Sequence, residues 1–71
     1  MNTAKKAEIE AIEYIRIAEV KRLTGLSTST IYRMSVSGAF PKQVKLGAQA
    51  VAWVKSEVDQ WAAGKASARA S

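Results

Sequence analysis

Residues 17–38 read IAEVKRLTGLSTSTIYRMSVSG, which is the pattern of two short helices joined by a tight turn. Ile17, Val20 and Leu23 recur at three-residue spacing, as apolar residues do on one face of an amphipathic helix. Gly25 follows at the point where that helix should end, because glycine readily adopts the positive φ of a C-terminal cap. Two short helices around a glycine-containing turn predict a helix-turn-helix motif.

The second helix of this motif has a clear beginning and end in the sequence. Ser27 is a favoured N-cap residue, and the expected helix continues from it to Ser37. Gly38 and Pro41 should end the helix, and Phe40 between them can fold back as the apolar contact that often accompanies such an end.

One face of this second helix suits a core, and the opposite face suits a polar partner. At 100° per residue, Ile31, Met34 and Ser35 share the core-facing arc. The other arc carries hydroxyl groups, one aromatic ring and one guanidinium group, whereas an ordinary solvent-facing helix more often carries Glu and Lys. The residues on that arc are Thr28, Ser29, Tyr32, Arg33 and Val36.

The polar arc favours nucleic acid as its partner. Hydroxyl groups and the N–H groups of a helix N-terminus can donate hydrogen bonds to phosphate, and Arg33 can bind either a guanine edge or a phosphate. The alternative is structural: the Ser and Thr residues only cap the helix, and Tyr32 only packs. We favour the nucleic-acid interpretation, and both remain open at this point.

A change of period after the second helix predicts a β-hairpin. Residues 44–46 and 51–53 show the two-residue period that is typical of β-strands, and they flank the glycine-containing segment 47–50. A last helix is expected from Ser56 as its N-cap, with Asp59 at the capping-box position. The order of these elements predicts a mainly α fold with a small β-hairpin, that is, a small winged helix-turn-helix.

The expected domain covers residues 14–63. Residues 1–13 form a polar lead-in that is either a frayed helix or disordered, and residues 64–71 are expected to form a disordered tail because they are small and polar. Both tryptophans are assigned to the core rather than to base stacking, because each is in phase with apolar neighbours. The predicted core comprises Ile17, Val20, Leu23, Leu26, Ile31, Met34, Phe40, Val44, Leu46, Val51, Trp53, Val58 and Trp61.

Composition and charge narrow the classes of function. The chain has 71 residues, no cysteine and no histidine, so we expect neither an enzyme nor a bound metal or cofactor. Residues 20–55 contain Lys and Arg but no acidic residue, and the net charge of the chain is +5. This asymmetry favours a polyanionic partner, with nucleic acid ahead of membrane. No segment approaches the ~20 apolar residues of a transmembrane helix, and we expect a cytoplasmic protein.

Seven short segments between Ile15 and Ala62 carry, in one order and with compatible spacing, the motifs of a known family. They are IAEV (17–20), LTGLS (23–27), STIYR (29–33), GAFPK (38–42), VKLG (44–47), VAW (51–53) and SEVDQW (56–61). Each segment is weak evidence by itself, but together they are specific. The chain resembles the AlpA-type prophage regulators, which are small MerR-like winged helix-turn-helix proteins related to phage excisionases.

This resemblance implies a cytoplasmic bacterial protein that binds double-stranded DNA of a prophage or another integrated element. Such proteins act as transcriptional regulators, as excision directionality factors, or as both. The recognition helix maps to residues 28–36 and the wing to residues 45–51. Family members often carry an Arg near the wing tip, where this chain has Ala48-Gln49-Ala50. The residues expected to contact DNA are Thr28, Ser29, Tyr32, Arg33, Lys42, Lys45, Gln49 and Lys55.

The expected partners extend beyond DNA itself. A single module of this size buries only about 600–1,000 Å² on DNA, so we expect a homo-oligomer or several copies side by side, and an integrase is a further candidate partner. The alternative function is an adaptor or inhibitor that uses the same fold to bind a regulator or RNA polymerase. The two functions differ in salt dependence, because only phosphate contacts make affinity fall steeply with salt.

Overall fold

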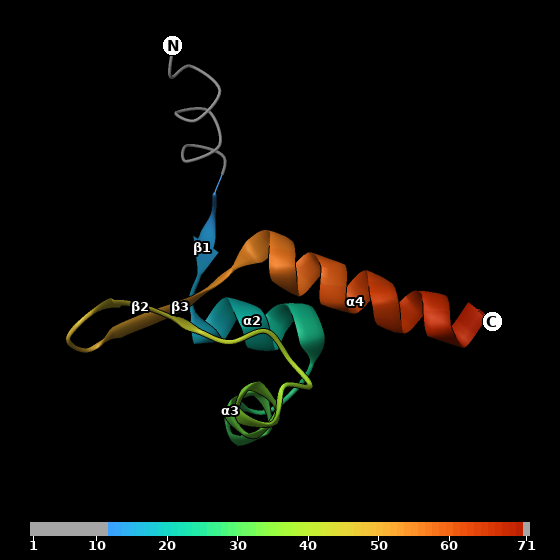
Figure 1. Cartoon of the computed structure of the whole chain (residues 1–71), viewed down its shortest axis with the longest axis horizontal. Coiled ribbons are helices and arrows are strands. Elements are labelled where there is room, and N and C mark those ends of the chain that lie inside the picture. Colours follow the sequence, from blue (N-terminus) through green and yellow to red (C-terminus); the bar gives the residue numbers. More distant parts are fainter. Residues whose placement is uncertain (1–11, 71) are drawn as a thin grey trace, which may run out of the picture.

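In a computed structural model that describes residues 12–70, the chain folds into helices around a small antiparallel sheet (Figure 1). This is the expected mainly α winged helix-turn-helix, with a third strand that the sequence did not predict. The lead-in expected over residues 1–13 lies outside the described residues, apart from its last two. The elements are β1 (Tyr14–Ile15), α2 (Ile17–Thr24), α3 (Thr28–Ser37), β2 (Val44–Gly47), β3 (Ala50–Val54) and α4 (Lys55–Ala70).

The turn between α2 and α3 is held by the two caps that the sequence predicts. Gly25 has φ 75°, and its amide donates to the carbonyl oxygen of Lys21 at 2.7 Å. Ser27 Oγ accepts from the amide of Thr30 at 3.2 Å, which satisfies one of the free N–H groups at the start of α3. Because both caps lie within three residues, the chain reverses tightly and presents α3 as a separate helix.

The end of α3 also follows the sequence prediction. Gly38 has φ 88°, and its amide donates to the carbonyl oxygen of Met34. Phe40 is then buried, with its ring edge-to-face against Trp61 at a centroid distance of 4.8 Å. The indole Nε1 of Trp61 donates to the carbonyl oxygen of Ala39 at 2.8 Å, so this turn is fixed against α4 by both an apolar and a polar contact.

The sheet has the strand order β1-β3-β2 and is antiparallel throughout. In β1, Tyr14 pairs with Val54 and Ile15 pairs with Trp53. The sequence gives no local sign of β1, because a strand of two residues has no period of its own. Its hydrogen-bonding partner lies about forty positions further along the chain, in β3.

One core lies between the sheet and the three helices. Most of the expected apolar residues belong to it, but Val44 and Val51 are only half-buried and lie outside the core cluster. Ile15 and Ala52 are buried residues that the prediction missed. The predicted core was wrong at Leu23, which is 38% exposed near the end of the short helix α2. It was also wrong at Leu46, which is 46% exposed where the hairpin extends past the helices (Figure 1). The buried apolar residues are Ile15, Val20, Ile31, Phe40, Ala52, Trp53 and Val58.

Helix α4 begins at Lys55, two residues earlier than an N-cap at Ser56 predicts. β3 passes directly into it at Lys55, whose amide donates to the carbonyl oxygen of Glu13 at 2.8 Å. Ser56 is therefore inside the helix rather than at its N-cap. Asp59 was expected in a capping box, but its Oδ2 lies 3.0 Å from the ammonium group of Lys55.

The expectation of a disordered tail over residues 64–71 was wrong as far as Ala70, where α4 ends. Small residues do not by themselves indicate disorder, because alanine has the highest helix propensity, and lysine and arginine are also good helix formers. The last turns of α4 extend beyond the core (Figure 1). The side chains of residues 62–69 are exposed. No helix within residues 12–70 combines the length and apolar character needed to cross a membrane.

Candidate nucleic-acid interface

The outer face of α3 is largely free of packing contacts with the rest of the protein. Thr28, Ser29 and Arg33 are exposed, and Val36 is 82% exposed. The opposite face is buried as expected, with Ile31 and Ser35 almost fully covered. The first turn of α3 contains no acidic side chain, so nothing on the helix itself opposes an anion at its N-terminus.

Tyr32 is the exception on this outer face because it is half-buried. Its ring packs edge-to-face against Trp53 at a centroid distance of 5.6 Å and an interplanar angle of 67°. Such aromatic pairs contribute to stability beyond the area that they bury. The ring of Tyr32 thus packs against the protein, as the alternative interpretation of this helix face proposes. Tyr32 links the outer face of α3 to the core.

A pair of hydrogen bonds fixes the segment that leaves α3. The carbonyl oxygen of Pro41 accepts from Ser35 Oγ at 2.9 Å and from Trp53 Nε1 at 3.0 Å. These bonds satisfy two buried donors, one from α3 and one from β3, at a single acceptor. They also hold Lys42, the next residue, beside α3.

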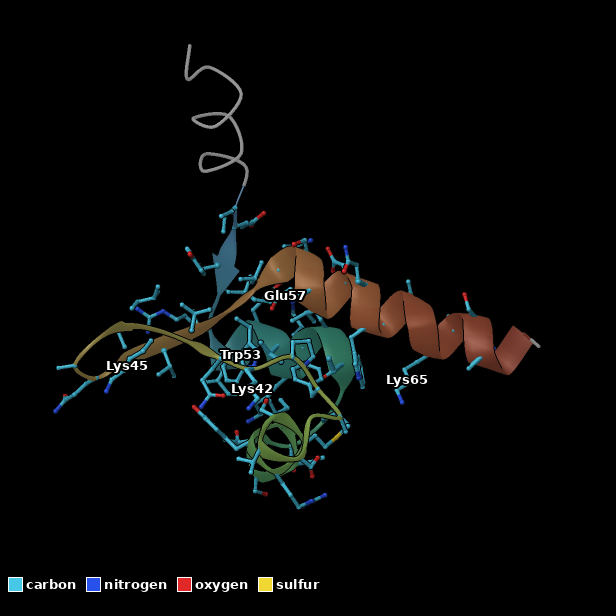
Figure 2. The ribbon with its side chains drawn as sticks, viewed as in Figure 1. Lys42, Lys45, Trp53, Glu57 and Lys65 are labelled. Atoms are coloured by element: carbon cyan, nitrogen blue, oxygen red, sulfur yellow. The ribbon has the colours of Figure 1, made fainter. Side chains whose placement is uncertain are left out.

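A groove of about 490 Å³ lies between α3 and the hairpin. Val36 and Val51 supply apolar surface, while Lys42 and Lys45 bring two ammonium groups. Figure 2 shows Lys42 on the segment that leads from α3 and Lys45 further out along the hairpin. The full lining is Ser35, Val36, Lys42, Gln43, Lys45 and Val51.

The hairpin that forms the wing is short and irregular. Lys45 pairs with Val51, and the register then shifts before Gly47 pairs with Ala50. A shift of this kind re-aims the side chains of a strand. Gln49 is exposed at the turn, where this chain has no charged side chain.

Of the lysines expected to contact DNA, Lys42 and Lys45 line the groove, whereas Lys55 does not. Its ammonium group is 3.0 Å from Asp59 Oδ2, and this hydrogen bond raises the pKa of Lys55. The carboxylates of Glu13 and Glu19 raise the pKa of Lys55 further. Lys55 therefore lies in an acidic neighbourhood and has no place in the groove beside α3.

The basic residues of segment 20–55 fall into two groups. Lys55 and Arg22 are paired, since Arg22 Nε donates to Glu19 Oε1 at 2.9 Å and the guanidinium also contacts Glu19 Oε2. Accordingly, the pKa of Glu19 is lowered and that of Arg22 is raised. Within residues 12–70, no acidic partner forms an ion pair with the others, which are Lys21, Arg33, Lys42 and Lys45. The same residues contain no cluster that could hold a metal ion.

The fold and this surface define a small winged helix-turn-helix protein with a basic groove beside its second helix. The family model described as prophage CP4-57 regulatory protein (AlpA) matches residues 13–66, and the chain belongs to this family. The matched range covers the sheet, the helix-turn-helix and most of α4. The resemblance inferred from the short sequence segments is thus confirmed.

Two relatives show how closely the chain follows known proteins. An uncharacterised protein, ORF88, of Enterobacteria phage P4 is 47% identical over 62 residues, which is 87% of this chain and 70% of the relative. The DNA-binding transcriptional activator AlpA of Escherichia coli K12 is 32% identical over 57 residues, which is 72% of this chain and 81% of the relative.

Proposed function

We propose that this protein binds double-stranded DNA through α3 and the groove beside it, and that it regulates transcription in a prophage or another integrated element. The observation that carries the proposal is the groove itself, next to the exposed face of α3, with two lysines that form no ion pair with an acidic residue among residues 12–70. The name of the Escherichia coli relative, a DNA-binding transcriptional activator, supports the same class of function.

In this proposal α3 lies in the major groove of DNA. A helix of ten residues is about 15 Å long, and the major groove is about 12 Å wide, so α3 fits with its exposed face toward the bases. Thr28 and Ser29 donate to phosphate at the helix N-terminus. Arg33, one turn further along, binds a guanine edge or a phosphate.

The groove and the wing hold the sugar–phosphate backbone that runs beside α3. Lys42 and Lys45 neutralise phosphates there, and Gln49 at the wing tip adds a polar contact. Tyr32 acts mainly by fixing α3 on Trp53, given its half-buried ring. Lys55 is withdrawn from the proposed contacts because it is paired with Asp59.

The proposal extends to the biological role of the protein. We propose that several copies, or a homo-oligomer, occupy neighbouring sites, since one module buries too little surface for tight specific binding. The same DNA-binding activity can serve transcription, the direction of excision, or both. In an excision complex, an integrase would be the protein partner. Localisation in the bacterial cytoplasm follows from this role.

Titration of labelled duplex DNA at several salt concentrations tests the proposed function. The probes are DNA from upstream of the protein's own gene and a random duplex of equal length. Binding should be tighter to the upstream DNA, and log affinity should fall by about 0.9 per tenfold increase in salt for each phosphate contact. No binding to either probe would contradict the proposal and favour an adaptor that binds a regulator or RNA polymerase.

A further inference from the structure

Val36 is strongly exposed and lines the groove. It is 82% exposed, whereas the next most exposed large apolar residues among those described, Ile12 and Leu46, are at 46%. A single exposed apolar residue is ordinary on a protein surface. Val36, however, lines the groove together with Lys42 and Lys45, so the proposed phosphate contacts would hold DNA against it.

The residue does not contribute to the packing of the domain. Val36 is absent from the cluster of residues that form and surround the core, although Ser35 beside it is buried. Valine also has a lower helix propensity than the Lys, Glu or Ala that would suit an exposed helical position. Neither packing nor helix formation therefore accounts for an apolar β-branched side chain at this place.

We propose that Val36 is a specificity-determining residue that contacts the methyl group of a thymine. This inference rests on the proposed DNA binding by α3. In the major groove, the C5-methyl of thymine is the one apolar group among the base edges, and apolar side chains are its natural partners. Contact would remove both the methyl group and Val36 from water, which provides a favourable free energy that no other base offers.

The position of Val36 on α3 predicts where that thymine lies. Val36 follows Arg33 by three residues, so the two are neighbours on one face, separated by about 4.5 Å along the helix axis. One base step is about 3.4 Å along a strand. The thymine should therefore lie within one or two base pairs of the position that Arg33 contacts.

The experiment begins with selection of a preferred site from a random duplex pool of about 20 base pairs, which is two turns of DNA. Each thymine near the Arg33 position is then replaced singly by deoxyuridine, which lacks only the methyl group. At one thymine, the replacement should weaken binding of the wild-type protein about fourfold, as expected for one buried methyl group. In Val36→Ala, the effect at that position should shrink below twofold, while binding to the thymine duplex also weakens.

Leu46→Ala is the matched control, because Leu46 is exposed on the hairpin and does not line the groove. It should retain the full sensitivity to deoxyuridine. The inference is overturned if every thymine tolerates the replacement, if Val36→Ala retains the wild-type sensitivity, or if no preferred site is selected although DNA is bound. Failure of the wild-type protein to bind any duplex would instead overturn the proposed function, and the inference with it.

Discussion

The carbonyl oxygen of Pro41 joins α3 to β3 in the segment that leads toward the wing. It accepts from Ser35 Oγ and Trp53 Nε1, and Trp53 in turn supports the ring of Tyr32. Trp53 is completely buried in a domain of 71 residues, so it contributes a large share of the core. The indole of Trp53 therefore helps to fix the orientation of α3 relative to β3.

Replacing Trp53 by Ala should lower the free energy of unfolding by about 3–5 kcal/mol, because it leaves a large cavity and removes the hydrogen bond from the indole to the carbonyl oxygen of Pro41. Trp53→Phe retains an aromatic ring but has no N–H group, and it should cost less, about 1–2 kcal/mol. Urea denaturation followed by circular dichroism gives both values. Equal stabilities of the wild type and Trp53→Ala would contradict the central place of this residue.

Arg33 and Lys45 should have different effects on DNA binding. Arg33→Ala should weaken binding to the selected site by about 1–3 kcal/mol and relax the preference at one base position. Lys45→Ala should weaken binding to all sequences alike and reduce the salt slope by about one unit, as expected for a phosphate contact. Fluorescence anisotropy with selected and random duplexes measures both effects.

Lys55→Ala is the control for loss of a positive charge. Because Lys55 is paired with Asp59, its removal should change affinity less than either other substitution. Equal losses in all three variants would mean that only the net charge matters. If Arg33→Ala weakens selected and random DNA equally, Arg33 is a phosphate contact and specificity lies elsewhere on α3.

At the scale of the elements, glycine has opposite effects on two helices, at the end of α2 and in the interior of α4. Gly25 ends α2 with φ 75°, a conformation that other residues adopt only with strain. Gly64 lies inside α4 without a positive φ, and a methyl group there would meet nothing within 4 Å. The first glycine is thus required by the turn, whereas the second only weakens the helix.

Gly25→Ala should therefore lower the free energy of unfolding by about 1–2 kcal/mol, although a methyl group there would also meet nothing within 4 Å. Gly64→Ala should increase the helix content of α4, with a change in helix free energy of up to about 1 kcal/mol. Thermal denaturation and circular dichroism at 222 nm, the usual helix band, compare the two variants. Stabilisation by Gly25→Ala would mean that the turn does not need its left-handed conformation.

These elements also explain which parts of the fold the sequence could predict. The caps at Ser27, Gly25 and Gly38 act within a few residues, so their signals are local and the predictions from them are confirmed. The pairing of β1 with β3 and the pairing of Lys55 with Asp59 depend on where β3 ends and α4 begins. No local pattern specifies that junction, so the sequence indicates neither β1 nor the pairing of Lys55 with Asp59.

At the scale of the whole molecule, the charged residues that give the net charge of +5 are unevenly distributed along the chain. Acidic residues lie mainly before α3 and in α4, where they neutralise Arg22 and Lys55. Lys42 and Lys45, which form no ion pair within the described part of the chain, lie at the groove. The two lysines at the groove strengthen the electrostatic field that would attract DNA there, while ion pairing reduces the contributions of Arg22 and Lys55.

The absence of histidine from the chain predicts that DNA affinity depends on salt but hardly on pH near neutrality. A nearby phosphate raises the pKa of a lysine, but a lysine with an ordinary pKa near 10.4 is already fully protonated at neutral pH. Binding should therefore take up almost no protons between about pH 6 and pH 7, since free carboxylates ordinarily titrate near 4 and the chain has no imidazole. Anisotropy titrations at constant ionic strength should give equal dissociation constants at both pH values. A change of about threefold or more would mean that a carboxylate with a raised pKa takes part in the interface.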